Sequence, residues 1–176
     1  MTKMARKHRI ALVMGSTSDI PQVEPALEIL KELQIPYTTR VLSAHRTPDA
    51  LRKFAKEAGP EGIQVIIACA GAAAHLAGVI ASHTDLPVIG VPMAGTTLGG
   101  LDALFSTVQM PGGVPVATMG IGKAGTKNAA LMAARILALQ DPNLAETLAR
   151  KREAQEARVL ELDKEIQAQG TWTWEG

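Results

Sequence analysis

The chain has 176 residues, of which 47% are hydrophobic and 3% aromatic, and its formal net charge is +1. This length predicts one principal domain with about 70% of its unfolded surface buried, and the near-neutral charge argues against a nucleic-acid partner. No segment approaches the ~20 apolar residues of a membrane-spanning helix, and we expect no signal peptide. Cys69 is the single cysteine, so no internal disulfide is expected, and we predict a cytoplasmic protein with no membrane partner.

Strand and helix patterns alternate along the chain. Short apolar or β-branched runs predict five strands, at residues 9–14, 35–43, 63–69, 86–92 and 113–119. Helical spacing or composition predicts helices at residues 21–33 and 47–58, in the later part of the segment 71–84, which begins Gly-rich, within 93–112, and at 125–139 and 141–170. Alternation with short connections is typical of a doubly wound α/β sheet of the flavodoxin-like or Rossmann-like kind.

The last predicted helix is a separate feature. We expect a catalytic domain at residues 1–140 and a helical extension with a tail at residues 141–176. The apolar residues of this helix form an interrupted stripe in a charged sequence: Leu144, Leu148, Val159, Leu162 and Ile166. The helix therefore lies either on its own domain or against a neighbouring subunit. The terminal segment 171–176, with Trp172 and Trp174, is either frayed or docked on a neighbour.

Three polar loops follow the first three predicted strands, at the sheet edge where open α/β folds bind ligands. The first reads GSTSD and offers hydroxyl groups at Ser16 and Ser18 and main-chain N–H groups at a helix start, which suits a phosphate. The Asp19 carboxylate is better placed to accept hydrogen bonds from sugar hydroxyls. The loop has neither a Walker nor a dinucleotide pattern, which disfavours nucleoside triphosphates and NAD. The alternative is a helix-capping cluster that binds nothing.

The second loop contains Ser43, His45 and Arg46. A guanidinium group can bind a phosphate through two parallel N–H bonds, and an imidazole can take and give a proton near neutral pH. Thr47 is expected to cap the following helix, with Pro48 at its first position. The alternative for the His–Arg pair alone is a solvated turn.

The third loop, residues 70–75, has almost no side chains before His75, so a flat heterocycle could lie against its backbone. The alternative is that small residues allow tight packing and that His75 caps a turn. The four histidines show no metal-ligand spacing, so we expect no metal site. Cys69 ends a buried strand and is expected to be an inert thiol of the core.

Several motifs occur in order between residues 9 and 139: VMGSTSD, SAHRTPD, AGAAAHLAG, LPVIGVPM and the stretch from LDALFSTVQMPGG to AALMAARIL. Together they resemble the PurE family of purine biosynthesis, and within it the class I members, the 5-(carboxyamino)imidazole ribonucleotide mutases. The resemblance implies a three-layer flavodoxin-like domain in a homo-octamer with active sites near subunit boundaries. It also implies transfer of a carboxylate from the exocyclic nitrogen of a ribonucleotide to carbon 4 of its imidazole ring, without ATP, metal or biotin.

The same resemblance implies roles for individual residues. Ser16 and Asp19 would hold the phosphate and ribose, Arg46 would bind phosphate, and His45 would carry the proton. Other residues of the second and third loops complete the substrate-binding set: Ser43, Gly71, Ala74, His75 and Leu76. The chain departs from the usual pattern with Ala72 for a glycine, Ala77 for a proline and Ile20 for an aromatic residue. These changes are expected to alter the mobility of the third loop, and none removes a proposed catalytic group.

Two alternatives to the mutase remain. One is the related class II carboxylase, which uses free CO2 and aminoimidazole ribonucleotide, although the retained AAHL segment favours the mutase. The other is a non-catalytic nucleotide- or flavin-binding module, because one fold can serve many functions.

Overall fold

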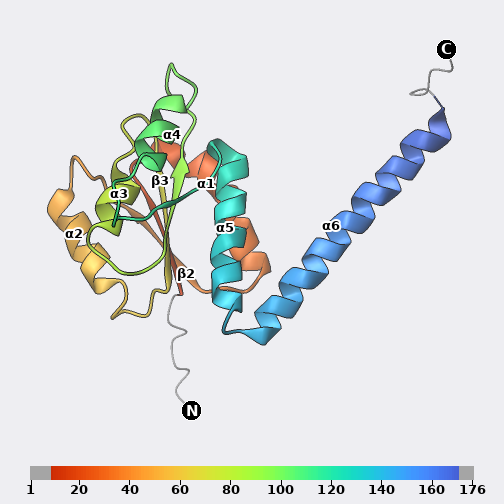
Figure 1. Cartoon of the computed structure of the whole chain (residues 1–176), viewed down its shortest axis with the longest axis horizontal. Coiled ribbons are helices and arrows are strands. Elements are labelled where there is room, and N and C mark those ends of the chain that lie inside the picture. The colour runs from red at the N-terminus through yellow and green to blue at the C-terminus, as the bar shows by residue number, and fades with distance from the viewer. Residues whose placement is uncertain (1–8, 171–176) are drawn as a thin grey trace. The chain divides into compact units, whose positions relative to one another are not determined.

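A computed structural model describes residues 9–170, and these residues form two compact units that divide between Leu137 and Ala138. The first unit contains a five-stranded parallel sheet (Figure 1) with the order β2-β1-β3-β4-β5. Its strands are β1 (Ile10–Met14), β2 (Tyr37–Val41), β3 (Val65–Ala70), β4 (Val88–Pro92) and β5 (Ala117–Thr118). This parallel arrangement confirms the predicted flavodoxin-like α/β fold.

Helices cover both faces of the sheet. The first unit contains a 3₁₀ turn, η1 (Thr17–Asp19), and five helices: α1 (Ile20–Glu32), α2 (Pro48–Glu57), α3 (Leu76–Ala81), α4 (Leu101–Val108) and α5 (Gly122–Ala138). Helices α1 and α5 lie on one side of the sheet and α2 and α3 on the other (Figure 1). The result is the three-layer structure expected from the resemblance.

The burial of the strands follows from these layers. Strands β1 and β4 are buried at every residue, because a parallel strand covered on both faces needs no polar alternation. On one face, Leu51 and Phe54 of α2 join Leu76 and Ile80 of α3 in one apolar cluster against the sheet. The side of α5 that is buried consists mainly of small residues: Ala129, Ala130, Ala133 and Ala134. Small side chains let this helix lie close to its neighbours, which explains how a core with few aromatic residues is filled.

Strand register brings three loops to one level. Met14, the last residue of β1, is paired with Val41 on one side and Cys69 on the other. The amide of Gly15 donates to the Cys69 carbonyl at 3.1 Å, and the amide of Leu42 donates to the Met14 carbonyl at 3.0 Å. The loops after β1, β2 and β3 therefore start side by side, where the order of the strands reverses and a crevice forms.

Helix α3 follows a loop, as predicted, whereas β5 is shorter than predicted. Helix α3 begins at Leu76, because residues 71–75 form a loop in which Ala72 has a φ of +53° and cannot continue a right-handed helix. Strand β5 has only two residues, paired with Ile89 and Gly90 of β4.

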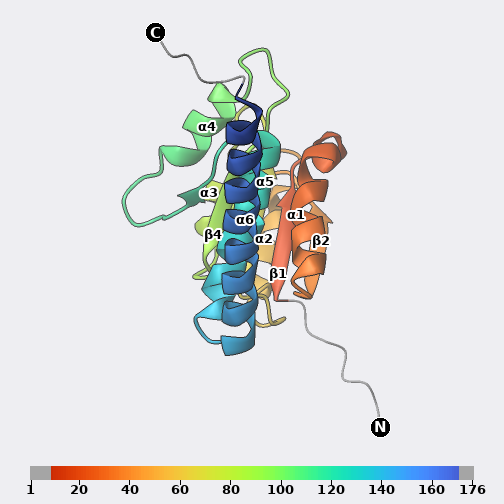
Figure 2. The same cartoon turned by 90° about the vertical axis from the view of Figure 1, so that its right-hand side faces the viewer.

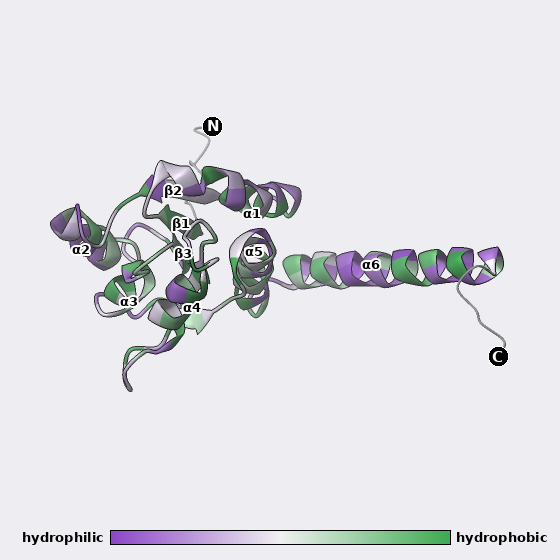
Figure 3. Cartoon of the chain, turned by 90° about the horizontal axis from the view of Figure 1, so that it is seen from above, coloured by the Kyte–Doolittle hydropathy of each residue, from purple (hydrophilic) through white to green (hydrophobic). Residues whose placement is uncertain are grey.

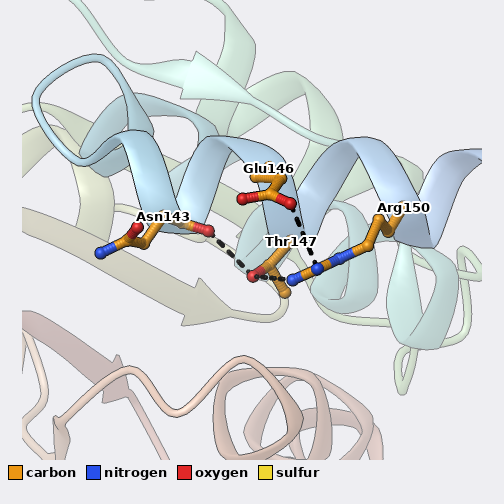
Figure 4. A network of polar contacts seen from close by, with 4 residues as sticks. All are labelled: Asn143, Glu146, Thr147 and Arg150. Atoms are coloured by element: carbon orange, nitrogen blue, oxygen red, sulfur yellow. Dashed lines mark hydrogen bonds and ion pairs between the residues drawn. The ribbon is translucent and has the colours of Figure 1, made fainter.

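The second unit contains α6 (Pro142–Gln169), seen end to end in Figure 2 and from above in Figure 3. The Asp141 side chain caps it by accepting from the Leu144 amide at 3.2 Å, and Gly170 ends it at a φ of +64°. Polar side chains one turn apart on this helix bond to each other (Figure 4): Arg150 donates to Glu146 at 3.3 Å and to Thr147 at 3.4 Å. Such exposed pairs contribute only a few tenths of a kcal/mol each.

Leu144 is the one buried residue of α6. Four large apolar side chains of this helix are about half exposed: Val159, Leu160, Leu162 and Ile166. Apolar and polar residues alternate along its length (Figure 3). The segment 171–176, with both tryptophans, lies outside the described residues. No helix in residues 9–170 is long and apolar enough to cross a membrane.

Candidate functional site

A pocket of about 580 Å³ lies where four strands of the sheet end, and the loops after β1, β2, β3 and β4 line it. Eight of the nine predicted site residues line this pocket: Ser16, Asp19, Ser43, His45, Arg46, Gly71, His75 and Leu76. The ninth, Ala74, is 2% exposed and belongs to the core beneath the loop. The structure thus brings the three predicted loops together around one cavity.

The first loop presents its hydroxyl groups and its carboxylate separately. Ser16 is the cap of η1, and its hydroxyl oxygen accepts from the Ser18 amide at 3.2 Å and from the Ser18 hydroxyl at 2.8 Å. Asp19 occupies the cap position of α1, but its side chain makes no capping hydrogen bond. The carboxylate is therefore available to a ligand, whereas an aspartate that only capped the helix would use its carboxylate for the cap.

Burial raises the pKa of Asp19 above its ordinary value of 3.8, and a hydrogen bond from the Ser16 backbone offsets part of that rise. An aspartate with a raised pKa in the folded state favours folding most at low pH, and it loses that contribution as the pH rises through the folded pKa. Ionised Asp19 thus carries a cost in the empty protein at pH 7, which a ligand hydroxyl donating to it would reduce.

We expect Asp19→Asn to be more stable to urea than the wild type at pH 7, because the amide removes the cost of burying a charge. The advantage should shrink as the pH falls through the raised pKa of Asp19, where the wild-type carboxylate becomes neutral. Urea midpoints at several pH values measure this. A loss of stability that is the same at every pH would contradict it.

The second loop is held by Thr47 and Ser43. The Thr47 hydroxyl accepts from the Ser43 amide at 2.9 Å and donates to the Ser43 carbonyl at 3.1 Å. Thr47 precedes α2 as predicted, but its side chain does not cap the helix because both of these bonds point back to Ser43. Thr47 is thus the N-cap residue, as predicted, but its hydroxyl closes the loop and makes no capping hydrogen bond.

Arg46 is anchored to two of the three loops. One of its Nη2 hydrogens is donated to the Gly15 carbonyl at 3.0 Å, and its amide donates to the Ser43 hydroxyl at 3.1 Å. A guanidinium group has five N–H groups, so others remain for a ligand. The side chain is therefore fixed beside the serines of the first loop, as binding of one anion by both loops requires.

His45 and His75 contact each other across the pocket. Nε2 of His45 lies 2.8 Å from Nδ1 of His75, and the two rings meet edge to face with centroids 4.9 Å apart. A hydrogen bond between two imidazole nitrogens needs one N–H and one lone pair, so a proton lies between the rings. This pair can deliver a proton to a ligand or receive one from it.

The third loop turns at Ala72, which has a φ of +53°. An L-residue in this left-handed region is strained by roughly 1–2 kcal/mol, and glycine is not. The alanine at this position therefore stores strain in the loop that carries His75 and narrows the conformations open to that loop.

We expect Ala72→Gly to stabilise the chain by up to about 1 kcal/mol, because relief of strain exceeds the entropy that glycine adds to the unfolded state. Ala73→Gly is the matched control, since Ala73 is also exposed and has no positive φ. It should be neutral or destabilising in the same urea titration. Destabilisation by both variants would contradict the argument.

Sequence reasoning missed the fourth wall of the pocket. Gln22 of α1 and the segment 93–96, which follows β4, also line the cavity. The rule that located the first three loops applies equally to β4, because all parallel strands end at one edge. The loop-rich composition of residues 93–112 was a usable signal, whereas nothing in the sequence marked Gln22.

Cys69 lies beneath this site. It is fully buried and free, and burial raises the pKa of its thiol far above the ordinary range, with a smaller contribution from the Asp19 charge. The prediction of an inert core thiol agrees with this environment. Among residues 9–170, no three His, Cys, Asp or Glu side chains are grouped to hold a metal ion.

Comparison with known proteins shows the family to which this chain is related. The model of the AIR carboxylase family matches residues 9–158. The N5-carboxyaminoimidazole ribonucleotide mutase of Bacillus subtilis is 52% identical over 157 residues, which cover 89% of this chain and 97% of the relative. The Escherichia coli K12 protein of the same name is 54% identical, with coverage of 87% and 90%. The crystal structure of Treponema denticola PurE superposes with a TM-score of 0.81 at 29% identity, covering 89% of this chain and 97% of that one.

Proposed function

This chain belongs to the AIR carboxylase family and acts in purine biosynthesis as an isomerase with N5-carboxyaminoimidazole ribonucleotide mutase activity, and we propose that the pocket at the strand ends is its active site. The observation that carries the site assignment is the convergence of a proton-bearing pair, His45 and His75, with Arg46 in one cavity. A non-catalytic module would need none of this arrangement.

The two ends of the ribonucleotide match different parts of the pocket. Its phosphate is bound by Arg46 and by the loop of Ser16, where a guanidinium group, a hydroxyl and amides meet. Its ribose hydroxyls donate to the Asp19 carboxylate. The imidazole ring then lies against the backbone of the small-residue third loop, beside Gly71 and Leu76.

The reaction moves one carboxyl group and one proton. The bond between the exocyclic nitrogen and the carboxyl carbon breaks, which releases CO2 within the pocket and leaves a nitrogen that gains a proton. Carbon 4 of the ring then attacks the CO2 and loses its own proton. His45 supplies the first proton and removes the second, so atoms and charge balance without a further reactant. His75 holds the His45 ring through the 2.8 Å bond.

Retention of the carboxyl group tests this mechanism against that of a carboxylase. Substrate labelled with ¹³C in its carbamate is given to the protein in excess unlabelled bicarbonate, and ¹³C NMR follows the label. We expect the label to appear in the carboxylate on carbon 4. Strict dependence on bicarbonate, with an unlabelled product, would overturn the mutase mechanism in favour of the carboxylase.

We further propose that the protein is a homo-octamer in the cytoplasm. An apolar stripe on the outer side of α4 supports self-association, because Leu101, Phe105 and Val108 are each about half exposed at helical spacing. The exposed apolar residues of α6 described above support it further. The free, buried Cys69 is consistent with a reducing compartment. Sedimentation equilibrium of the full chain tests the assembly, and a monomer would refute it.

A further inference from the structure

Gln22 connects two segments that are far apart in the sequence. It is the third residue of α1, lines the pocket and is half-buried. Its side chain reaches Ala94, which lies 72 residues further along the chain, in the loop that follows β4. The pocket wall formed by residues 93–96 is thus fixed to α1 by a side chain.

The contact is reciprocal. The Ala94 amide donates to Oε1 of Gln22 at 3.1 Å, and Nε2 of Gln22 donates to the Ala94 carbonyl. The opposite orientation of the side-chain amide would place N–H against N–H and oxygen against oxygen, so the two bonds fix it. Gln22 satisfies both polar groups of the Ala94 backbone, as a neighbouring strand would.

Gln22 is itself held in place. Its carbonyl accepts from the Thr126 hydroxyl of α5 at 2.7 Å, and Thr126 is fully buried. Gly122 has a φ of +70°, and a side chain there would bring a Cβ within 3.2 Å of Oε1 of Gln22. The backbone and the side chain of Gln22 are therefore both held in position, at the point where α1, α5 and the 93–96 segment meet.

The wall has a second anchor at its far end. The Thr96 hydroxyl donates to the Asp102 carboxylate at 2.9 Å. Gly95 lies between the two anchors, and nothing would contact a side chain there. Met93, at the start of the segment, is buried and donates its amide to the Ala70 carbonyl at 2.9 Å. Loss of the Gln22 bonds would leave the stretch between Met93 and Thr96 without an anchor, with the polar groups of Ala94 free to turn into the pocket.

We propose that Gln22 is a positioning residue for substrate binding, which keeps the 93–96 wall closed on the ribonucleotide and takes no part in proton transfer. This inference rests on the proposed active site. It predicts a change in KM with little change in kcat, because the wall is equally needed in the bound substrate and in the transition state.

Two variants of the full-length protein separate the role of the bonds from that of packing. Gln22→Met keeps the length of the side chain and removes both bonds. Gln22→Glu keeps an acceptor for the Ala94 amide but places an oxygen against the Ala94 carbonyl. Glu28→Met, on the exposed side of α1, is the control for an added methionine.

We expect both Gln22 variants to raise KM for the substrate by about tenfold with kcat within about twofold. Gln22→Met loses two modest hydrogen bonds, and Gln22→Glu loses one and sets two oxygens against each other. Hydrogen exchange of the peptide spanning Ala94 should be faster than in the wild type, and Glu28→Met should change nothing. Unchanged KM, or a joint fall of kcat and thermal stability, would overturn the proposal. Absence of turnover by the wild type would instead refute the proposed function. Hydrogen exchange at Ala94 would then test the role of Gln22 by itself, and equal exchange in the wild type and the Gln22 variants would overturn the proposal.

Discussion

His45→Asn is expected to lower kcat for the mutase reaction by about 10²- to 10⁴-fold, the usual contribution of a general acid–base. Asparagine is close to histidine in size and can still bond to His75, but it cannot take and return a proton near neutral pH. KM should stay within a few-fold, because the groups proposed to bind phosphate and ribose are untouched. Conversion of saturating substrate to the 4-carboxylate, followed by absorbance, measures the loss.

His83→Asn is the matched control for this experiment. His83 follows α3 and does not line the pocket, and its amide donates to the Ile80 carbonyl, a bond that asparagine keeps. This variant should have wild-type kinetics. Turnover of His45→Asn within tenfold of the wild type would refute the assignment of His45 as proton carrier. A loss that lies in KM alone would assign it to binding instead.

The sequence predicts structure well where a run of one residue type is compatible with one kind of element. Apolar runs such as residues 65–70 predict buried strands, because only a strand covered on both faces tolerates them. The order of the strands then places the following loops at one edge. Eight of the nine site residues could be grouped in this way, and Ala74 could not, since whether a small residue faces ligand or core depends on the turn.

The contact between His45 and His75 lay beyond sequence reasoning. Strands β2 and β3 are not neighbours, because β1 lies between them. Their ends are therefore two strand spacings, about 10 Å, apart, and both loops must bend over the end of β1 for the rings to meet at 2.8 Å. The left-handed turn at Ala72 is part of that bend, and an alanine gives no sign of it. Gln22 is similar, because its partner is 72 residues away and no periodic pattern connects them.

Arg46→Met is expected to lower kcat/KM for the ribonucleotide by about 10- to 100-fold, because a hydrogen bond to a charged group contributes about 1.5–3 kcal/mol. The decisive comparison uses the corresponding ribonucleoside, which lacks the phosphate. The wild type and Arg46→Met should process this truncated substrate equally slowly, since the arginine has nothing left to bind. Steady-state kinetics with both substrates for both proteins give the coupling between side chain and phosphate.

This comparison distinguishes a phosphate ligand from a structural arginine. Arg46 also bonds to the Gly15 carbonyl, so its removal loosens the first loop and could slow turnover of any substrate. A structural role would lower kcat/KM for ribonucleotide and ribonucleoside by the same factor, whereas phosphate binding affects the ribonucleotide alone. Arg52→Met is the matched control, because Arg52 lies on α2 in an exposed pair with Asp49 and such pairs contribute little. Equal losses on both substrates would thus leave Arg46 as a support of the Gly15 loop and move the phosphate to another part of the pocket.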